Sequence, residues 1–350
     1  MNEQIKAARE IITGYQGRPL RIMEVCGTHT HEIFRLGIRK LLPESIDVIS
    51  GPGCPVCVTA VGFIDEACWL ALEKGCIICT FGDLIKVPGT EMSLAQARAK
   101  GAQVRPVYSP LDAVELAKEN PDKQVAFLAV GFETTTPSAC LAAKQAKAEG
   151  LKNFSLLTAN KTMPNAYNAL VGSADAFIYP GNVNAIPGNG ACIRLCEEKG
   201  VSGVVAGFTA NELLIALAVA IKLLQKGEPF FRNCYPRVVK DEGNLAAIKL
   251  MDEVMEPCDS EWRGLGMIPM SGMKLREEYA EYDSRIKYSM PEIKGRPNPA
   301  CRCGDVLQGK CKPSDCKVFG KVCTPLHPIG ACMVSDEGAC SAYYQYSGII

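Results

Sequence analysis

Residues 124–137, QVAFLAVGFETTTP, contain an apolar run that ends in a glycine-containing loop. Short, uninterrupted apolar runs are typical of strands that are buried on both faces, as in parallel sheets. Between Arg21 and Phe208, similar runs alternate with amphipathic stretches and end in Gly, Pro, Asn or Thr. This alternation predicts an open parallel α/β fold.

We expect eight strands in this region, too many for one small sheet. They cover Arg21–Val25, Asp47–Ser50, Cys76–Thr80, Gln103–Val107, Gln124–Val130, Phe154–Ala159, Ala176–Tyr179 and Gly203–Ala206. The prediction is therefore two small, similar parallel-sheet α/β domains, with boundaries near Asn120–Lys123 and Gly227–Pro229. Residues 1–120 and 121–229 would form these domains, and residues 230–350 an irregular, α-rich third domain.

The composition restricts the class of protein. The 38 Lys and Arg residues balance the 38 Asp and Glu residues, so no overall field attracts nucleic acid or an anionic membrane. The longest fully apolar run, Leu213–Ile221, is far shorter than the roughly 20 residues that cross a bilayer. The charged first ten residues lack the apolar core of a secretory signal, so we expect a cytoplasmic protein. In that compartment, eighteen cysteines indicate metal binding or thiol chemistry.

Seven cysteines fall within the forty residues that end at Cys340: Cys301, Cys303, Cys311, Cys316, Cys323, Cys332 and Cys340. No Cys-x-x-Cys zinc knuckle occurs among them, and the wide spacings suit a larger cluster. We expect a 4Fe-4S cluster on Cys301, Cys316, Cys323 and Cys340, with Cys303 as the substitute for Cys301. A zinc-stapled or disulfide-rich tail is the alternative.

A second Cys/His group lies near the start of the chain. Cys26 ends an expected strand and is followed by His29 and His31, two of the three histidines. A thiolate beside an imidazole suits iron or zinc, and a thiolate next to an imidazolium or a helix start would be reactive. A cysteine packed in the core is the alternative.

Cys54 and Cys57 form a Cys-x-x-Cys pair in residues 51–57, GPGCPVC, after another expected strand. A helix start would depress the pKa of these thiols, and the pair could exchange two electrons through a disulfide. Together with Cys26 and His29, the pair could instead complete a Cys3His zinc site.

Other polar groups follow the expected strands. Residues 131–137 could cradle an anion, although an ordinary capped helix start explains them equally. In such sheets the loops at the carboxyl ends of the strands converge, so one cleft could collect most of these loops. Asp83, Lys86 and Lys161 could supply polar groups to this cleft, or could be solvated surface residues.

Taken together, these motifs resemble the HypD family of hydrogenase maturation factors over nearly the whole chain. The resemblance rests on residues 26–31, 51–57, 80–83, 131–137, 256–258, 262–266 and 337–340. It implies a scaffold on which iron receives cyanide and carbon monoxide, as in the Fe(CN)2CO centre of nickel-iron hydrogenases. The partners that it implies are a small HypC-like chaperone and a HypE-like cyanide donor.

The resemblance also implies residue roles. Cys26 would ligate the iron with a cysteine of the small partner, and His29 would lie beside it. Cys54 and Cys57 would form a redox-active dithiol connected to the 4Fe-4S cluster, and Glu337 would join the catalytic group. Residues 181–184, GNVN, depart from the family pattern, in which a His after the Gly is expected. An iron-sulfur-dependent thiol-disulfide oxidoreductase and a structural zinc protein remain the alternative functions.

Overall fold

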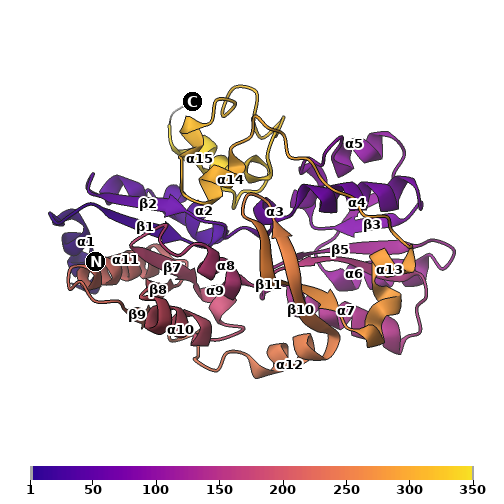
Figure 1. Cartoon of the computed structure of the whole chain (residues 1–350), viewed down its shortest axis with the longest axis horizontal. Coiled ribbons are helices and arrows are strands. Elements are labelled where there is room, and N and C mark those ends of the chain that lie inside the picture. The colour runs from indigo at the N-terminus through magenta and orange to yellow at the C-terminus, as the bar shows by residue number, and fades with distance from the viewer. Residues whose placement is uncertain (1–2, 349–350) are drawn as a thin grey trace.

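Two parallel sheets with helices on both faces form the body of the protein (Figure 1). The computed structural model describes residues 3–348. The first sheet has the order β2-β1-β7-β8-β9, and the second the order β4-β3-β5-β6. The strands of the first sheet are β1 Leu20–Glu24, β2 Ile46–Ser50, β7 Ala176–Pro180, β8 Ser202–Ala206 and β9 Phe231–Asn233. Those of the second are β3 Ile77–Thr80, β4 Val104–Pro106, β5 Val125–Gly131 and β6 Phe154–Asn160.

All eight predicted strands are present, within about two residues of their expected bounds. Every residue of β5, β7 and β8 is buried, which explains why these strands read as continuous apolar runs. The prediction of two parallel α/β sheets is confirmed.

The predicted boundary at residue 120 does not separate the two sheets. The first sheet takes β1 and β2 from before this boundary and β7 to β9 from after it, with Ile22 opposite Ala176. It also extends past residue 229, because β9 is its edge strand. Local periodicity identifies strands but not their neighbours, which depend on how distant segments pack.

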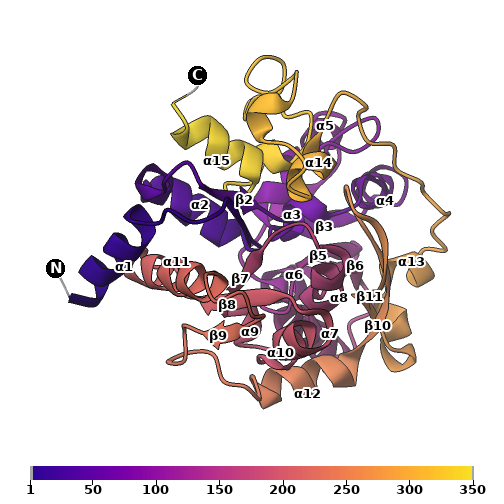
Figure 2. The same ribbon diagram turned by 60° about the vertical axis from the view of Figure 1, so that its left-hand side comes forward.

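Helices complete the two layers around each sheet. They are α1 Glu3–Thr13, α2 Gly27–Arg35, α3 Pro55–Val58, α4 Val61–Leu72, α5 Leu94–Ala99, α6 Pro110–Glu119, α7 Thr136–Ala148, α8 Met163–Ala169, α9 Gly181–Asn184, α10 Gly190–Lys199, α11 Ala210–Leu224, α12 Leu245–Val254, α13 Ser284–Lys287, α14 Cys303–Leu307 and α15 Ala339–Tyr346. Short 3-10 helices are η1 Ile38–Leu41, η2 Gly82–Lys86, η3 Glu277–Tyr282, η4 Pro313–Asp315 and η5 Ala331–Met333. Helices α1 and α11 lie side by side (Figure 2) and cover one face of the first sheet.

Helix α11 contains the longest apolar run. It begins with a capping box, in which Thr209 accepts from the backbone of Glu212 and the Glu212 carboxylate accepts from the backbone of Thr209. Within residues 3–348, none of the helices combines the length and the apolar character that crossing a bilayer requires.

An antiparallel hairpin, which the sequence did not reveal, lies between the two sheets (Figure 1). It consists of β10 Met255–Trp262 and β11 Gly266–Leu275. Isolated bridges join Thr59 to Trp262 and Lys161 to Gly272, so the hairpin contacts segments that follow different strands. Strand β11 continues to Leu275, and the 3-10 helix η3 follows it.

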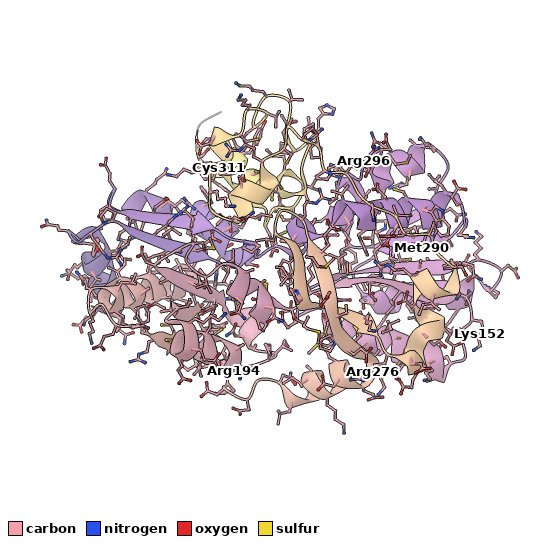
Figure 3. All side chains as sticks on the ribbon, in the orientation of Figure 1. Lys152, Arg194, Arg276, Met290, Arg296 and Cys311 are labelled. Carbon is pink, nitrogen blue, oxygen red and sulfur yellow. The ribbon has the colours of Figure 1, made fainter. Side chains whose placement is uncertain are left out.

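The C-terminal segment is irregular, as predicted. Residues 289–299 cross the second sheet's lobe without regular structure, and Arg296 forms an ion pair with Glu91 there (Figure 3). The segment then folds over α2 and α3 through short helices, and α15 packs against α2 (Figure 2). The cysteine-rich tail is thus held close to the N-terminal Cys/His group.

Candidate functional site

Cys26 and Cys54 lie side by side because the loops after β1 and β2 are in direct contact. The Gly27 N–H donates to the Gly53 carbonyl at 2.9 Å. A Cβ atom on Gly53 would lie only 2.1 Å from the Cys26 nitrogen, and one on Gly27 would lie 3.0 Å from the Cys54 Cβ. Glycine at both positions therefore allows the two cysteine loops to meet.

Glu337 joins this site from the C-terminal segment. A Cβ atom on Gly27 would lie 2.6 Å from the Glu337 Cβ, and the Thr28 hydroxyl donates to Glu337 Oε1 at 2.6 Å. The Thr28 hydroxyl also hydrogen-bonds to the Cys26 thiol. Thr28 thus connects the thiol to a carboxylate more than 300 residues away in sequence.

Burial controls the protonation of Cys26 and His29. Cys26 is 4% exposed, and burial raises the pKa of its thiol to about 12. Burial likewise lowers the pKa of His29 to about 4, so its imidazole is neutral near neutral pH. His29 Nε2 donates to the Gly207 carbonyl at 3.0 Å, which leaves the lone pair on Nδ1. Among the described residues, His29 Nδ1 has no hydrogen-bond partner.

Cys54 and Cys57 form a close, buried pair of free thiols at the start of α3. The Cys57 N–H donates to Cys54 Sγ at 3.3 Å. Burial raises the pKa of Cys57 well above its ordinary value, so the expected pKa depression by the helix start is wrong for this thiol. The helix has only four residues, and its dipole cannot offset the loss of water around a thiolate.

A row of thiols connects this pair to the C-terminal cysteines. Cys57 hydrogen-bonds to Cys332, and Cys332 Sγ lies 3.0 Å from Cys303 Sγ. Cys303 in turn hydrogen-bonds to Cys301. Cys332 had no predicted role, and Cys303 was predicted only as a substitute ligand, because no local spacing pattern relates these two residues to Cys57.

The four predicted cluster cysteines also converge. Burial and the neighbouring thiols Cys303, Cys301, Cys323 and Cys316 raise the pKa of Cys340 well above its ordinary value. Cys316, Cys323 and Cys340 pack together with Met333. These free thiols, in a segment with little secondary structure, fit a 4Fe-4S cluster. The choice of Cys301 over Cys303 as a ligand stays a prediction.

Within residues 3–348, no three His, Cys, Asp or Glu side chains are placed to hold a single metal ion. This arrangement therefore does not provide the Cys3His zinc site that was considered from sequence. An iron-sulfur cube holds its thiolates farther apart than one ion does.

The hairpin turn at residues 263–265 connects the two groups of cysteines. The Arg263 N–H donates to the Val58 carbonyl at 2.8 Å, which ties the turn to α3. Gly264 has a positive φ of 85°, and a Cβ atom there would lie 2.3 Å from the Gly304 Cα in α14. Only glycine permits both this conformation and this contact.

The other predicted polar groups have separate positions. The hydroxyls of Thr135 and Thr136 donate to the Phe132 carbonyl, as at an ordinary helix start. Asp83 is exposed and accepts from Ser335 at 2.9 Å, and Lys86 is exposed.

Lys161 lies near Cys258 and not near Cys26. It lines a cavity of about 410 Å³ against the hairpin, and the lining of this cavity does not include Cys26. Its ammonium donates to Ser260 Oγ at 2.6 Å and to the Glu261 carbonyl at 2.7 Å. Burial lowers the pKa of Lys161 to about 7. Lys161 therefore does not share a cavity with Cys26, in contrast to the single cleft that was considered from sequence.

Comparisons with known proteins identify the family of the chain. The sequence model of the HypD family, described as "Hydrogenase formation hypA family", matches residues 2–347. The chain is 43% identical over 351 residues to the hydrogenase maturation factor HypD of Azotobacter vinelandii, covering 97% of this chain and 93% of that protein. It is 44% identical over 336 residues to HypD of Escherichia coli (strain K12), covering 94% and 90%. It is 43% identical over 333 residues to a putative hydrogenase expression/formation protein of Methanocaldococcus jannaschii, covering 94% and 93%. The chain therefore belongs to the HypD family of hydrogenase maturation factors.

Proposed function

We propose that this chain acts in nickel-iron hydrogenase maturation as a scaffold on which an iron ion receives cyanide and carbon monoxide. The observation that carries the proposal is the meeting of Cys26, Cys54 and Glu337 around Gly27. Three residues after Cys26, the buried His29 keeps a free Nδ1 lone pair. Soft thiolate and imidazole ligands in a site shielded from water suit low-valent iron. In this proposal the iron is the substrate, and Cys26 and His29 bind it.

Binding the iron requires Cys26 to lose its proton. With a pKa of about 12 the thiol does not ionise near neutral pH on its own, but a metal ion displaces the proton. The Thr28 hydroxyl contacts both the Cys26 thiol and Glu337 Oε1, so it can relay the proton to the carboxylate. Glu337 thus acts as the base when Cys26 binds iron.

Cys54 and Cys57 would supply or accept two electrons. When they close a disulfide, two thiols lose two protons and two electrons. The neighbouring pair Cys303 and Cys332 can take these electrons by exchange: Cys57 attacks Cys332 of a Cys303–Cys332 disulfide and displaces Cys303. Cys54 then attacks Cys57, releases Cys332 and completes the transfer. The 3.0 Å separation of Cys303 Sγ and Cys332 Sγ, and the contact of Cys332 with Cys57, support this route.

The 4Fe-4S cluster would be held by Cys301, Cys316, Cys323 and Cys340. When bound, it would supply one-electron transfer. Cys301 also contacts Cys303, so the last thiol of the row is itself a proposed ligand.

The partners in this proposal are a HypC-like small protein, which adds a cysteine to the iron, and a HypE-like cyanide donor. Cys26 and His29 fill only part of an iron coordination sphere, which leaves positions for the partner and for the diatomic ligands. The reactions need reduced thiols, and all eighteen cysteines are free. We therefore place the protein in a reducing compartment, the cytoplasm.

The test is anaerobic co-purification with the small partner, followed by infrared spectroscopy in the cyanide and carbonyl stretching region. Bands are expected in the wild-type complex and in the control variant Cys140→Ala, which changes a buried cysteine of α7. Cys26→Ala should abolish them. Bands that persist in Cys26→Ala would show that iron is assembled elsewhere.

A thiol-disulfide oxidoreductase is the second candidate, and the continuous row from Cys57 to Cys303 favours it. Such an enzyme would reduce a disulfide substrate without needing Cys26. Turnover that survives Cys26→Ala but is lost in Cys54→Ala would support it over the scaffold.

A further inference from the structure

The cavity at the hairpin brings together a thiol and an amine that the proposed iron site does not use. Cys258 of β10 and Lys161, which follows β6, both line this cavity of about 410 Å³. Pockets for small molecules have volumes of roughly 300–1,000 Å³. Lys161 is buried, whereas Cys258 is half-buried. The cavity is therefore large enough for a small ligand that contacts both groups.

A glycine allows these groups to lie close to one another. Gly272 is opposite Cys258 in the hairpin, and an isolated bridge joins it to Lys161. A Cβ atom on Gly272 would lie 3.2 Å from Cys258 Sγ and 3.2 Å from Ser260 Oγ. The Lys161 nitrogen donates to this Ser260 hydroxyl at 2.6 Å. The thiol, the hydroxyl and the amine thus lie around the bare side of one residue.

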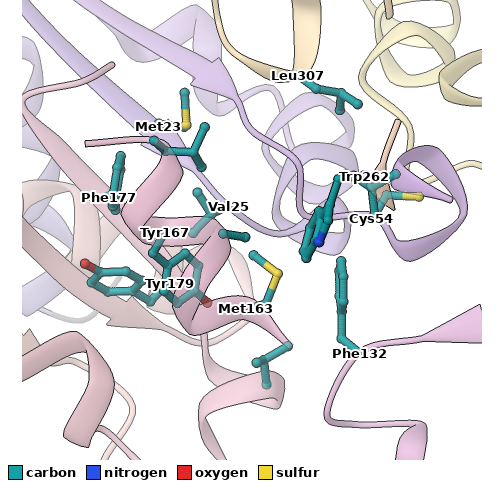
Figure 4. Packing of buried hydrophobic residues seen from close by; sticks show 14 of the residues in the cluster. Met23, Val25, Cys54, Phe132, Met163, Tyr167, Phe177, Tyr179, Trp262 and Leu307 are labelled. Atoms are coloured by element: carbon teal, nitrogen blue, oxygen red, sulfur yellow. The ribbon is translucent and has the colours of Figure 1, made fainter. Parts of the chain in front are cut away.

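Trp262 fixes the hairpin in this position. The Lys161 nitrogen lies 5.4 Å from the centroid of the Trp262 ring. Trp262 is fully buried and stacks on Phe132, and both pack with Met163 in the apolar cluster shown in Figure 4. This wall of the cavity is therefore part of the core, which keeps Lys161 and the hairpin in a fixed relation.

Lys161 differs from the other cations at the cavity because no carboxylate within residues 3–348 pairs with it. Its two acceptors are neutral, namely the Ser260 hydroxyl and the Glu261 carbonyl, at 2.6 and 2.7 Å. The other two cations are paired with carboxylates: Arg285 with Glu66 and Lys274 with Glu256. A neutral lysine has two N–H groups and one lone pair. Because both N–H groups are used here, the lone pair remains to accept a proton.

The protonation states favour a transfer from the thiol to the amine. Burial lowers the pKa of Lys161 to about 7, so a large share of the molecules carry a neutral amine near neutral pH. Burial raises the pKa of Cys258, although Lys274, Lys161 and Arg285 act against this rise. The thiol thus needs a base before it can react, and a base lies in the same cavity.

We propose that Cys258, with Lys161 as its base, is a site at which a low-molecular-weight disulfide attaches to the protein. The Cys258 proton moves to the Lys161 nitrogen, directly or through one water molecule, and the thiolate attacks one sulfur of the disulfide. The S–S bond breaks, and the departing thiolate takes the proton from Lys161. Cys258 is thereby oxidised to a mixed disulfide, the departing sulfur is reduced to a thiol, and the attached half lies in the cavity. This site is independent of the proposed iron chemistry.

The experiment treats the whole, fully reduced protein with oxidised glutathione under anaerobic conditions. Peptide mass spectrometry then gives the rate of modification at each cysteine. Cys196 and Cys234 are the matched controls, since both are half-buried free thiols that do not line this cavity. Cys258 should be modified faster than either control. An equal or lower rate at Cys258 would overturn the inference, and this comparison requires no variant.

Lys161→Met tests the role of the base, since methionine fills the space of the lysine stem without an amine. The rate at Cys258 should fall by about a hundredfold, the lower end for a general base, while Cys196 and Cys234 keep their wild-type rates. A wild-type rate at Cys258 in the folded variant would refute the inference. If thermal unfolding shows that this variant does not fold, Ser260→Ala replaces it, because it removes one of the two contacts that hold the amine. The rate at Cys258 should then fall to a smaller extent, and an unchanged rate would again refute the inference.

Discussion

Replacing Gly53 with alanine should separate the two cysteine loops. The new Cβ would lie 2.1 Å from the Cys26 nitrogen, 2.2 Å from its Cα and 2.4 Å from the Val25 carbonyl carbon. Non-bonded carbon atoms need about 3.5 Å, so the loop would have to move by more than about 1 Å. All three neighbours are backbone atoms, which cannot rotate away as a side chain could.

We expect Gly53→Ala to lower the free energy of unfolding by about 3 kcal/mol, the upper end for overpacking in a well-packed core. This change corresponds to more than a hundredfold in the folding equilibrium. Equilibrium urea unfolding measures it, and the rate of Cys26 alkylation reports whether the loop has moved. Alkylation should accelerate, because Cys26 is only 4% exposed when the loops are in contact.

The matched control is Gly82→Ala, since a Cβ atom there has no neighbour within 4 Å. This variant should unfold within about 0.5 kcal/mol of wild type. If Gly53→Ala behaved like Gly82→Ala in both assays, the contact between the Cys26 and Cys54 loops would not exist in solution, and the site described above would be wrong.

Two further predictions concern the thiol row and a buried carboxylate. Cys332→Ser should leave Cys54 and Cys57 able to form a disulfide, but electrons from the cluster should reduce this disulfide more slowly. Mass spectrometry of trapped thiols would follow the reduction. Unchanged kinetics would exclude the route through Cys332. Glu24 is fully buried, and burial raises its pKa to about 8, so the folded state holds this proton more tightly than the unfolded state. Stability should therefore fall as the pH rises from about 4.5 to about 8, and Glu24→Gln should make the fall shallower, though Glu133 still contributes. Urea midpoints at pH 5 and pH 8.5 measure this effect, and an equally steep fall in the variant would contradict it.

Sequence patterns were sufficient to predict the local secondary structure and the reactive residue types. The apolar runs of β5, β7 and β8 predicted these strands, because a strand buried on both faces must be apolar along its length. The cysteine-rich tail could be recognised because a segment so poor in apolar periodicity needs another means of staying ordered. The order of unusual motifs was specific enough to indicate the family.

Pairings between distant segments could not be predicted in this way. Nothing in the sequence near β1 shows that β7 is one of its neighbours. Apolar and polar residues do not alternate regularly along β10 and β11, so the hairpin does not stand out in the sequence. The thiol row likewise depends on the contacts that the turn at Gly264 makes with α3 and α14.

Protonation was the other property that sequence could not supply. Spacing placed Cys26 beside His29 and Cys54 beside Cys57, and it suggested an imidazolium and thiolates. Burial reverses this, because removing water penalises every charged form, and the depth of burial is a property of the folded chain. The sequence by itself thus determined which reactive groups this protein carries and on which elements they lie, whereas only tertiary packing decided which of them meet and in which protonation state.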